Sequence, residues 1–274
     1  MNKLIIFLIL ILIINACSKN EKEILKIKET RQDLEMISVL EDAYKALEAG
    51  DTFGAAKKFL DAELIYPQSE WAPKALLMAA YSFYLQNSYS ETLLNLERYL
   101  KIYPKDQNVI YAHYLIAMSY YETIQDEKRD TAPLIKAKEK FNFIVENYPN
   151  TDFAIDSRFK LNLIDDLLAS KEMYLGRYYL SKEKWIAAIN RFKTVVNLYD
   201  QTVFIEEALH RLVEIYFKIG LENESQKYAK LLGYNYLSGE WYKKSYKIFN
   251  SNFSINRPKS NKKGVIDRFS EFFE

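Results

Sequence analysis

The chain has 274 residues, of which 49% are hydrophobic, and its 38 Lys and Arg nearly balance its 37 Asp and Glu. Seven glycines and six prolines are too few for a loop-rich, β-sandwich or collagen-like fold, so the composition favours helices. An aromatic content of 15% excludes a disordered chain, and the near-neutral charge gives no broad footprint for nucleic acid.

Residues 1–16 have the pattern of a secretory signal peptide. Lys3 precedes an unbroken apolar run over residues 4–14, which is too short to cross a hydrocarbon core that needs about 20 helical residues. The run ends at Ile14-Asn15-Ala16-Cys17, which resembles the bacterial lipobox. We therefore expect lipid on Cys17 and permanent membrane attachment by several acyl chains. The alternative is that Cys17 ends an uncleaved signal.

Cys17 is the only cysteine, so no disulfide can form within the chain. A lone cysteine in a secreted protein needs an explanation, and use of its sulfur as a lipid anchor supplies one. Ser18 follows it, and by analogy with the sorting rule for such lipoproteins it favours the outer membrane. We interpret residues 17–30, rich in Lys and Glu, as the lipidated N-terminus and a spacer.

Residues 31–249 form a repeated pattern. Four segments end alike, and in each a small residue is followed four positions later by a large apolar one. The endings are Tyr66-Pro67, Tyr103-Pro104, Tyr148-Pro149 and Tyr199-Asp200, and the small residues are Ala55, Thr92, Ala137 and Ala188, with Ser225 in a weaker fifth segment. Leu175-Gly176, Tyr179, Ala188 and Phe192 match the tetratricopeptide pattern in register.

The predicted fold is therefore all-α, a tetratricopeptide-repeat solenoid of about five helix-turn-helix units, or ten antiparallel helices, in one cooperative domain. The small residue should let the two helices of a unit approach closely. We expect an insertion near residues 125–133, an unbroken helix from Asp152 to about Leu180, and a fifth unit whose second helix ends at Gly233. An irregular all-α domain is the alternative.

Residues 250–274 differ in composition from the repeats. The stretch 250–264 is rich in Asn, Ser, Lys and Arg and is predicted to be disordered. The chain then ends in a short amphipathic segment that either docks on a partner, caps the repeats or stays in solvent. Its apolar residues are Val265, Ile266, Phe269, Phe272 and Phe273.

The inventory of reactive side chains argues against an enzyme. The two histidines, His113 and His210, lie in separate units, and no Gly-rich phosphate loop or Cys/His metal spacing is present. Asp165-Asp166 and Glu206-Glu207 are adjacent in sequence, so on a helix each pair diverges by about 100° and forms no acid/base dyad. We expect no cofactor and no metal.

Longer runs resemble the BamD family, lipoproteins of the outer-membrane β-barrel assembly machinery. These runs are Tyr66 to Met78 with its Ser-Glu-Trp entry, Tyr120-Tyr121-Glu122 with Arg129-Asp130, Arg177-Tyr178-Tyr179 before Trp185, and Gly239-Glu240-Trp241-Tyr242. The resemblance covers about residues 31–249. It implies a non-catalytic scaffold on the periplasmic face of the outer membrane, which docks a BamA-like barrel insertase alongside accessory lipoproteins and helps recognise unfolded β-barrel precursors.

Two groups of residues are candidates for these roles. Tyrosine offers apolar area, a hydrogen-bonding tip and little rotamer entropy to lose, so a tyrosine-rich groove suits an extended amphipathic precursor segment. The candidate groove consists of Tyr44, Leu77, Tyr81, Tyr84, Tyr111, Tyr114, Met118 and Tyr121, with ordinary helix packing as the alternative. The candidate partner-docking residues are Arg177, Glu206, Glu207, Arg211 and Glu214, with solvated surface charge as the alternative.

Two other functions fit a repeat lipoprotein. The first is an adaptor of another envelope machine, such as cell-wall synthesis coordination, but that class typically adds a coiled-coil segment and no sustained heptad run is present. The second is a helical enzyme such as a lytic transglycosylase, for which the residues after the repeats are too few to form a catalytic domain.

Overall fold

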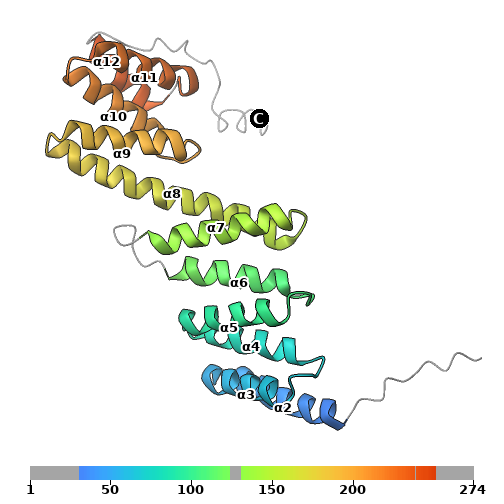
Figure 1. Cartoon of the computed structure of the whole chain (residues 1–274). Coiled ribbons are helices and arrows are strands. Elements are labelled where there is room, and N and C mark those ends of the chain that lie inside the picture. The colour runs from blue at the N-terminus through green and yellow to red at the C-terminus, as the bar shows by residue number, and fades with distance from the viewer. Residues whose placement is uncertain (1–30, 124–130, 238, 251–274) are drawn as a thin grey trace, which may run out of the picture. The chain divides into compact units, whose positions relative to one another are not determined.

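The structure is a computed structural model that describes residues 31–123, 131–237 and 239–250. The signal peptide, Cys17, the spacer, most of the predicted insertion and the tail beyond residue 250 lie outside these ranges. Every described element is an α-helix (Figure 1). The helices are α2 (Arg31–Glu48), α3 (Thr52–Ile65), α4 (Ala72–Leu85), α5 (Tyr89–Ile102), α6 (Val109–Glu122), α7 (Ala132–Asn147), α8 (Asp152–Ser181), α9 (Trp185–Leu198), α10 (Ile205–Lys218), α11 (Glu222–Asn235) and α12 (Glu240–Phe249).

The helices form two compact units, and the boundary between them falls inside α5, after Tyr99. In the first unit α3 packs against both α2 and α4. In the second unit each helix from α6 to α11 packs against the next, and α12 packs on α10 and α11. The paired arrangement confirms the all-α tetratricopeptide fold class, with α12 as a helix beyond the ten expected. The single cooperative domain stays a prediction.

The predicted repeat positions form the cores of both units. Ala55, Ala137 and Ala188 are fully buried, and so are Thr92 and Ser225 at the matching places. The aromatic residues four positions after the alanines, Phe59, Phe141 and Phe192, are also fully buried. Each such ring contributes roughly 1.5–3 kcal/mol through removal of its apolar surface from water.

The tyrosines at the helix ends make one turn that recurs five times. In each, the tyrosine carbonyl accepts a hydrogen bond from the backbone N–H three residues later, at 3.1–3.2 Å. The five donor–acceptor pairs are Ser69 to Tyr66, Asp106 to Tyr103, Thr151 to Tyr148, Thr202 to Tyr199 and Gly239 to Tyr236. The sequence pattern found the first four and missed Tyr236, because no proline or aspartate follows it.

Close helix approach depends on two glycines. A methyl group on Gly176 would lie 2.6 Å from Cε1 of Phe192, which confirms the predicted role of a small residue between paired helices. The prediction that Gly233 ends its helix is wrong, because α11 continues to Asn235. A methyl group on Gly233 would instead lie 2.8 Å from Cε2 of Tyr242, so the glycine makes room for α12.

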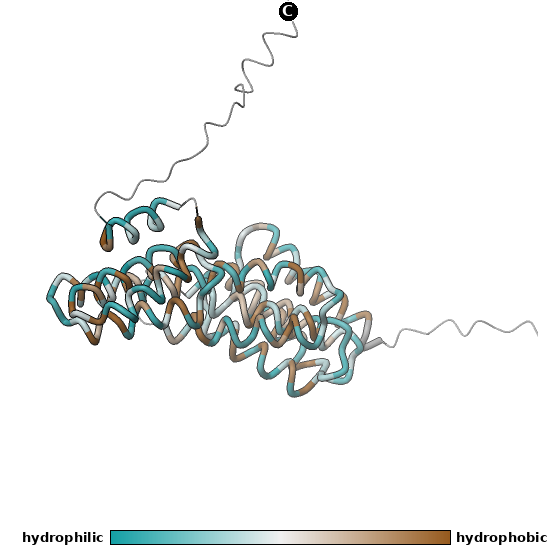
Figure 2. Tube along the Cα trace, turned by 90° about the horizontal axis from the view of Figure 1, so that it is seen from above, coloured by the Kyte–Doolittle hydropathy of each residue, from teal (hydrophilic) through white to brown (hydrophobic). Residues whose placement is uncertain are grey.

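Helix α8 is 30 residues long, as the unbroken pattern from Asp152 predicted. The Thr151 side chain caps its first turn by accepting a hydrogen bond from the backbone N–H of Ala154. None of the described helices combines the length and the apolar character that crossing a membrane requires. Figure 2 shows hydrophobic and hydrophilic residues interspersed along them.

Candidate functional site

The candidate groove residues all lie on the first helices of the first three repeats. Tyr44 is on α2, Leu77, Tyr81 and Tyr84 are on α4, and Tyr111, Tyr114, Met118 and Tyr121 are on α6. The first four belong to one compact unit and the last four to the other. Leu77 is only 5% exposed and so leaves little surface for a ligand, whereas the other seven are half-buried.

In the first unit, a lysine lies between two aromatic rings. Nζ of Lys74 is 5.8 Å from the ring centre of Tyr44 and 5.4 Å from that of Trp71. The Tyr44 ring packs edge-on against the buried Phe59 ring at 5.0 Å. Sequence reasoning missed Lys74, although its i, i+3 spacing from Trp71 is a signal that the two side chains share a helix face. Tyr44, Trp71 and Lys74 thus combine apolar area with one positive charge.

Tyr81 and Tyr84 complete the candidate surface of the first unit. Tyr84 packs against Tyr89, with ring centres 5.8 Å apart. Tyr81 is half-buried and makes neither a ring contact nor a hydrogen bond within the described part of the chain. Its removal would therefore leave no partner unsatisfied among those residues, which makes it the cleanest position for a binding test.

In the second unit, the tyrosines of α6 are tied to neighbouring helices. The Tyr114 hydroxyl donates a hydrogen bond of 2.6 Å to Oδ2 of Asp156 on α8, so its polar tip is already occupied. Its ring packs against Phe153 at 5.1 Å. The Tyr121 ring packs edge-on against Phe141, and Met118 packs against the same buried cluster. These residues of α6 thus serve helix packing as well.

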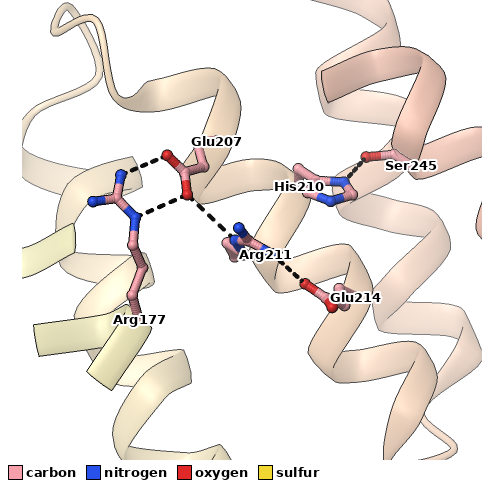
Figure 3. Close-up of polar contacts among 6 residues, drawn as sticks. All are labelled: Arg177, Glu207, His210, Arg211, Glu214 and Ser245. Atoms are coloured by element: carbon pink, nitrogen blue, oxygen red, sulfur yellow. Dashed lines mark hydrogen bonds and ion pairs between the residues drawn. The ribbon is translucent and has the colours of Figure 1, made fainter. Parts of the chain in front are cut away.

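Four of the five candidate docking residues form one charged network between α8 and α10 (Figure 3). Nε and Nη2 of Arg177 donate hydrogen bonds of 2.9 and 2.6 Å to the two carboxylate oxygens of Glu207. Nε of Arg211 donates to the same carboxylate at 3.3 Å, and its Nη1 donates to Glu214 at 2.9 Å. Glu206 lies apart from this network, beside Gly239. The structure thus pairs four of the five predicted residues with one another.

The network keeps Glu207 charged. Burial disfavours its carboxylate, but hydrogen bonds and charge from Arg177 and Arg211 outweigh that penalty and hold the pKa of Glu207 below its ordinary value. Oxygen atoms paired with two guanidinium groups are fixed in place by charge-assisted hydrogen bonds. The network therefore presents Arg211 and Glu214 in defined positions on α10.

Trp241 of α12 extends this surface. The guanidinium of Arg211 lies 5.5 Å from the indole ring centre, and Nζ of Lys244 lies 4.3 Å from it. The sequence contained a signal for this residue, since Trp and Arg are enriched where proteins bind one another, but no role was predicted for it. Arg211, Glu214 and Trp241 together form what we call the α10–α12 surface.

His210 lies beneath the α10–α12 surface and is 6% exposed. Its Nδ1 is 2.9 Å from the Ser245 hydroxyl, and its ring packs against Trp241 at 5.0 Å. Burial, reinforced by Arg211, lowers its pKa to about 4. The side chain is thus a neutral structural contact between α10 and α12 near pH 7.

A cavity of about 430 Å³ opens between α8 and the turn that joins α9 to α10. Asp165, Asp166 and Asp200 line it, together with Tyr199 and Thr202. Lys138 forms an ion pair with Asp165. Burial raises the pKa of the Tyr199 phenol, and the charge of Asp165 adds to the effect. Within the described residues, no group of His, Cys, Asp and Glu has an arrangement that would hold a metal ion.

Comparison with known proteins identifies relatives of the chain. Residues 32–231 match the family model for YfiO, an outer membrane lipoprotein. The outer membrane protein assembly factor BamD of Rickettsia prowazekii is 40% identical over 210 residues, which cover 77% of this chain and 81% of that one. BamD of Caulobacter vibrioides is 39% identical over 206 residues, with 75% and 68% covered.

A solved tetratricopeptide repeat protein from Parabacteroides merdae is 15% identical to this chain and has a TM-score of 0.35, with 78% of this chain and 73% of that one covered.

Proposed function

The chain belongs to the YfiO family of outer membrane lipoproteins, and from this premise we propose how its surfaces serve outer membrane protein assembly. It is a non-catalytic assembly factor like its BamD relatives. The match of the family model over residues 32–231 carries the family assignment, and the two BamD relatives carry the role in assembly. The proposal concerns two surfaces, one for precursor segments and one for a barrel insertase.

The first surface consists of the half-buried tyrosines of α2 and α4, with Trp71 and Lys74. An extended strand with alternating aromatic residues fits it, because the rings supply apolar contact and tyrosine loses little entropy on binding. Lys74 supplies a positive charge, which suits a segment that ends in a carboxylate. The tyrosines of α6 have the same character, although the Tyr114 hydroxyl already donates a hydrogen bond to Asp156.

Alanine at Tyr81 and Tyr84 tests the precursor surface. Each substitution should weaken binding of an aromatic C-terminal strand peptide by about 1 kcal/mol, or roughly fivefold in Kd, while the thermal unfolding midpoint stays nearly unchanged. Fluorescence anisotropy with a labelled peptide measures the affinity. Tyr174→Ala, which removes an exposed tyrosine of α8, is the matched control. Unchanged affinity in both α4 variants would exclude this surface.

The second surface is the α10–α12 surface, for which we propose a BamA-like insertase as partner. Its residues combine an indole, a guanidinium and a carboxylate in fixed positions, and Trp and Arg are enriched at the centre of protein interfaces. Because the Arg177–Glu207–Arg211 contacts orient the exposed groups in advance, little side-chain entropy is lost when a partner binds.

Charge reversal at Arg211 tests the docking surface. Arg211→Glu should reduce co-purification of the insertase about tenfold or more, because it breaks the network and places like charges beside Glu207 and Glu214. Arg191→Glu is the matched control, since Arg191 pairs with Glu172 between α8 and α9, away from the α10–α12 surface. Equal losses in both variants would indicate general damage to the fold rather than a docking role.

We further propose that the lipid of this lipoprotein is attached to Cys17, the chain's only cysteine. Cys17→Ala should abolish incorporation of labelled palmitate and release the protein from carbonate-washed membranes. Retained label in that variant would contradict the assignment.

A further inference from the structure

Four large apolar side chains lie exposed where two turns meet at one end of α10 and α11. Leu198 is 64% exposed, Val203 79%, Tyr234 86% and Leu237 65%. Leu198 and Val203 flank the turn between α9 and α10, and Tyr234 and Leu237 flank the turn that leads to α12. We call these four residues the apolar edge. Exposed apolar side chains that gather at one edge of a fold are candidates for coverage by another segment of chain.

The two turns are neighbours in space. A methyl group on Gly239 would lie 2.2 Å from Oε2 of Glu206, so the residue before α12 lies close to the first turn of α10. Burial raises the pKa of the Tyr236 phenol, and the negative charges of Glu206 and Asp200 raise it further. The apolar edge therefore lies beside a set of carboxylates.

This neighbourhood is negatively charged. Asp166, Asp200 and Glu206 form no ion pair with any residue that the structure describes, and Asp166 and Asp200 line the 430 Å³ cavity together with Leu198. A segment that contains both cations and large apolar residues would complement this surface, because the cations match the carboxylates and the apolar residues match the apolar edge.

The chain itself contains such a segment. Residues 251–264 include Arg257, Lys259, Lys262 and Lys263 and no acidic residue. The next nine residues carry Val265, Ile266, Phe269, Phe272 and Phe273 at the spacing of one helix face. The segment thus contains cations that can pair with the carboxylates and large apolar residues that can cover the apolar edge.

The length of the chain allows this match within one molecule. The described part ends at Asn250, at the far end of α12, and the ten residues of α12 span about 15 Å. The fourteen residues 251–264 can extend to about 46 Å, so they can return along α12 and pass the edge. A tether of this length holds its segment at roughly millimolar effective concentration, which favours it over a free partner.

We propose that residues 265–273 bind the apolar edge of the same molecule, while the cations of residues 257–263 lie across the carboxylates of the cavity. The segment thereby covers the exposed apolar side chains, beside the α10–α12 surface.

Cysteine crosslinking in the full lipidated chain tests this proposal independently of the role in assembly. Gln201→Cys places a thiol in the turn beside the edge, and Ser270→Cys places one in the tail between Phe269 and Phe272. With the lipid attached to Cys17, as proposed above, these are the only two thiols. The control pair is Asn223→Cys with Ser270→Cys, since Asn223 is exposed at the opposite end of α11.

An intrachain disulfide should form at least about tenfold faster in the Gln201 pair than in the Asn223 pair. Phe269→Ser with Phe272→Ser should abolish that difference, whereas Phe253→Ser, which removes a tail phenylalanine outside the segment, should leave it unchanged. Equal rates in the two pairs would overturn the proposal. Disulfide-linked dimers in place of the intrachain product would overturn it too, because the occupant would then be a second copy.

Discussion

Single residues control how closely the helices of this protein approach. Gly176 of α8 faces the Phe192 ring of α9, and no side chain fits between them without a shift. Phe192 is fully buried, so its ring cannot move into solvent. The close approach of α8 and α9 at this point therefore depends on the absence of a side chain at Gly176 and on the size of the Phe192 ring.

Gly176→Ala should destabilise the protein by about 1–2 kcal/mol. Overpacking costs typically 1–3 kcal/mol, and the better helix propensity of alanine returns up to about 1 kcal/mol of it. Urea unfolding followed by circular dichroism measures the change. Phe192→Leu in the Gly176→Ala background should cost less than it costs alone, because the smaller side chain relieves the clash. Strictly additive free energies would show that the two residues do not conflict.

His210 should make stability depend on pH. Its pKa is about 4 in the folded protein and 6.5 ordinarily, so the unfolded chain binds the proton more readily. The contribution is present in full above pH 6.5 and is lost as the pH falls from 6.5 to 4. Between pH 7.5 and 5 the free energy of unfolding should fall by about 2 kcal/mol from this group.

Other groups around His210 also carry charge, so a variant must isolate its contribution. Arg211, Glu207 and Glu214 lie on α10 with it, and Lys244 faces it from α12. The carboxylates titrate in His210→Asn as well, whereas asparagine does not. The difference between the two pH profiles of unfolding therefore reports His210 alone, and parallel profiles would show that folding leaves the pKa of the histidine unchanged.

At the scale of the element, the turns within repeats share a left-handed residue. Gly50, Asn87, Glu183 and Gly220 all have φ between +55° and +83°. Glycine adopts this conformation without strain and asparagine tolerates it, but for glutamate it costs energy. Each turn closes with a backbone hydrogen bond to a residue five positions back, as from Lys184 to Tyr179.

Glu183→Gly should therefore stabilise the protein by about 0.5–1 kcal/mol, because relief of strain exceeds the entropy that glycine adds to the unfolded chain. The melting temperature should rise by about 1–3 °C. The exposed Glu183–Lys218 ion pair lost in the variant contributes little. Asn87→Gly, at the same turn position, should change stability less. A larger gain at Asn87 would contradict the argument from strain.

Element ends and core positions were predictable from the sequence because they depend on local pattern. The Tyr-Pro endings located the ends of α3, α5 and α7, and the apolar period from Asp152 located α8. Gly233 was misjudged because its role depends on Tyr242 of α12, which no local pattern reports.

The candidate surfaces were predictable as helix faces but not as contacts. Arg177 and Glu207 are 30 positions apart, and Tyr114 and Asp156 are 42 apart, so their pairing depends on how the helices pack.

For the whole molecule, the open question is whether the two compact units unfold together. Their boundary falls inside α5, after Tyr99, and both Leu96 and Tyr99 are fully buried in the first unit. Helix formation is cooperative, so loss of either unit should destabilise a helix to which both contribute. Repeat arrays are coupled in the same way through their neighbours. We therefore expect a single unfolding transition.

The three tryptophans allow a direct test, because Trp71 lies in the first unit and Trp185 and Trp241 in the second. One variant keeps only Trp71, with phenylalanine at the other two positions, and a second keeps only Trp185. Each remaining indole packs against a buried cluster of its own unit, so its fluorescence reports unfolding there. Urea midpoints from fluorescence and circular dichroism should coincide in each variant. A fluorescence midpoint of Trp71 that precedes or follows the circular dichroism midpoint of the same variant would show that α5 breaks at the boundary and that the units unfold separately.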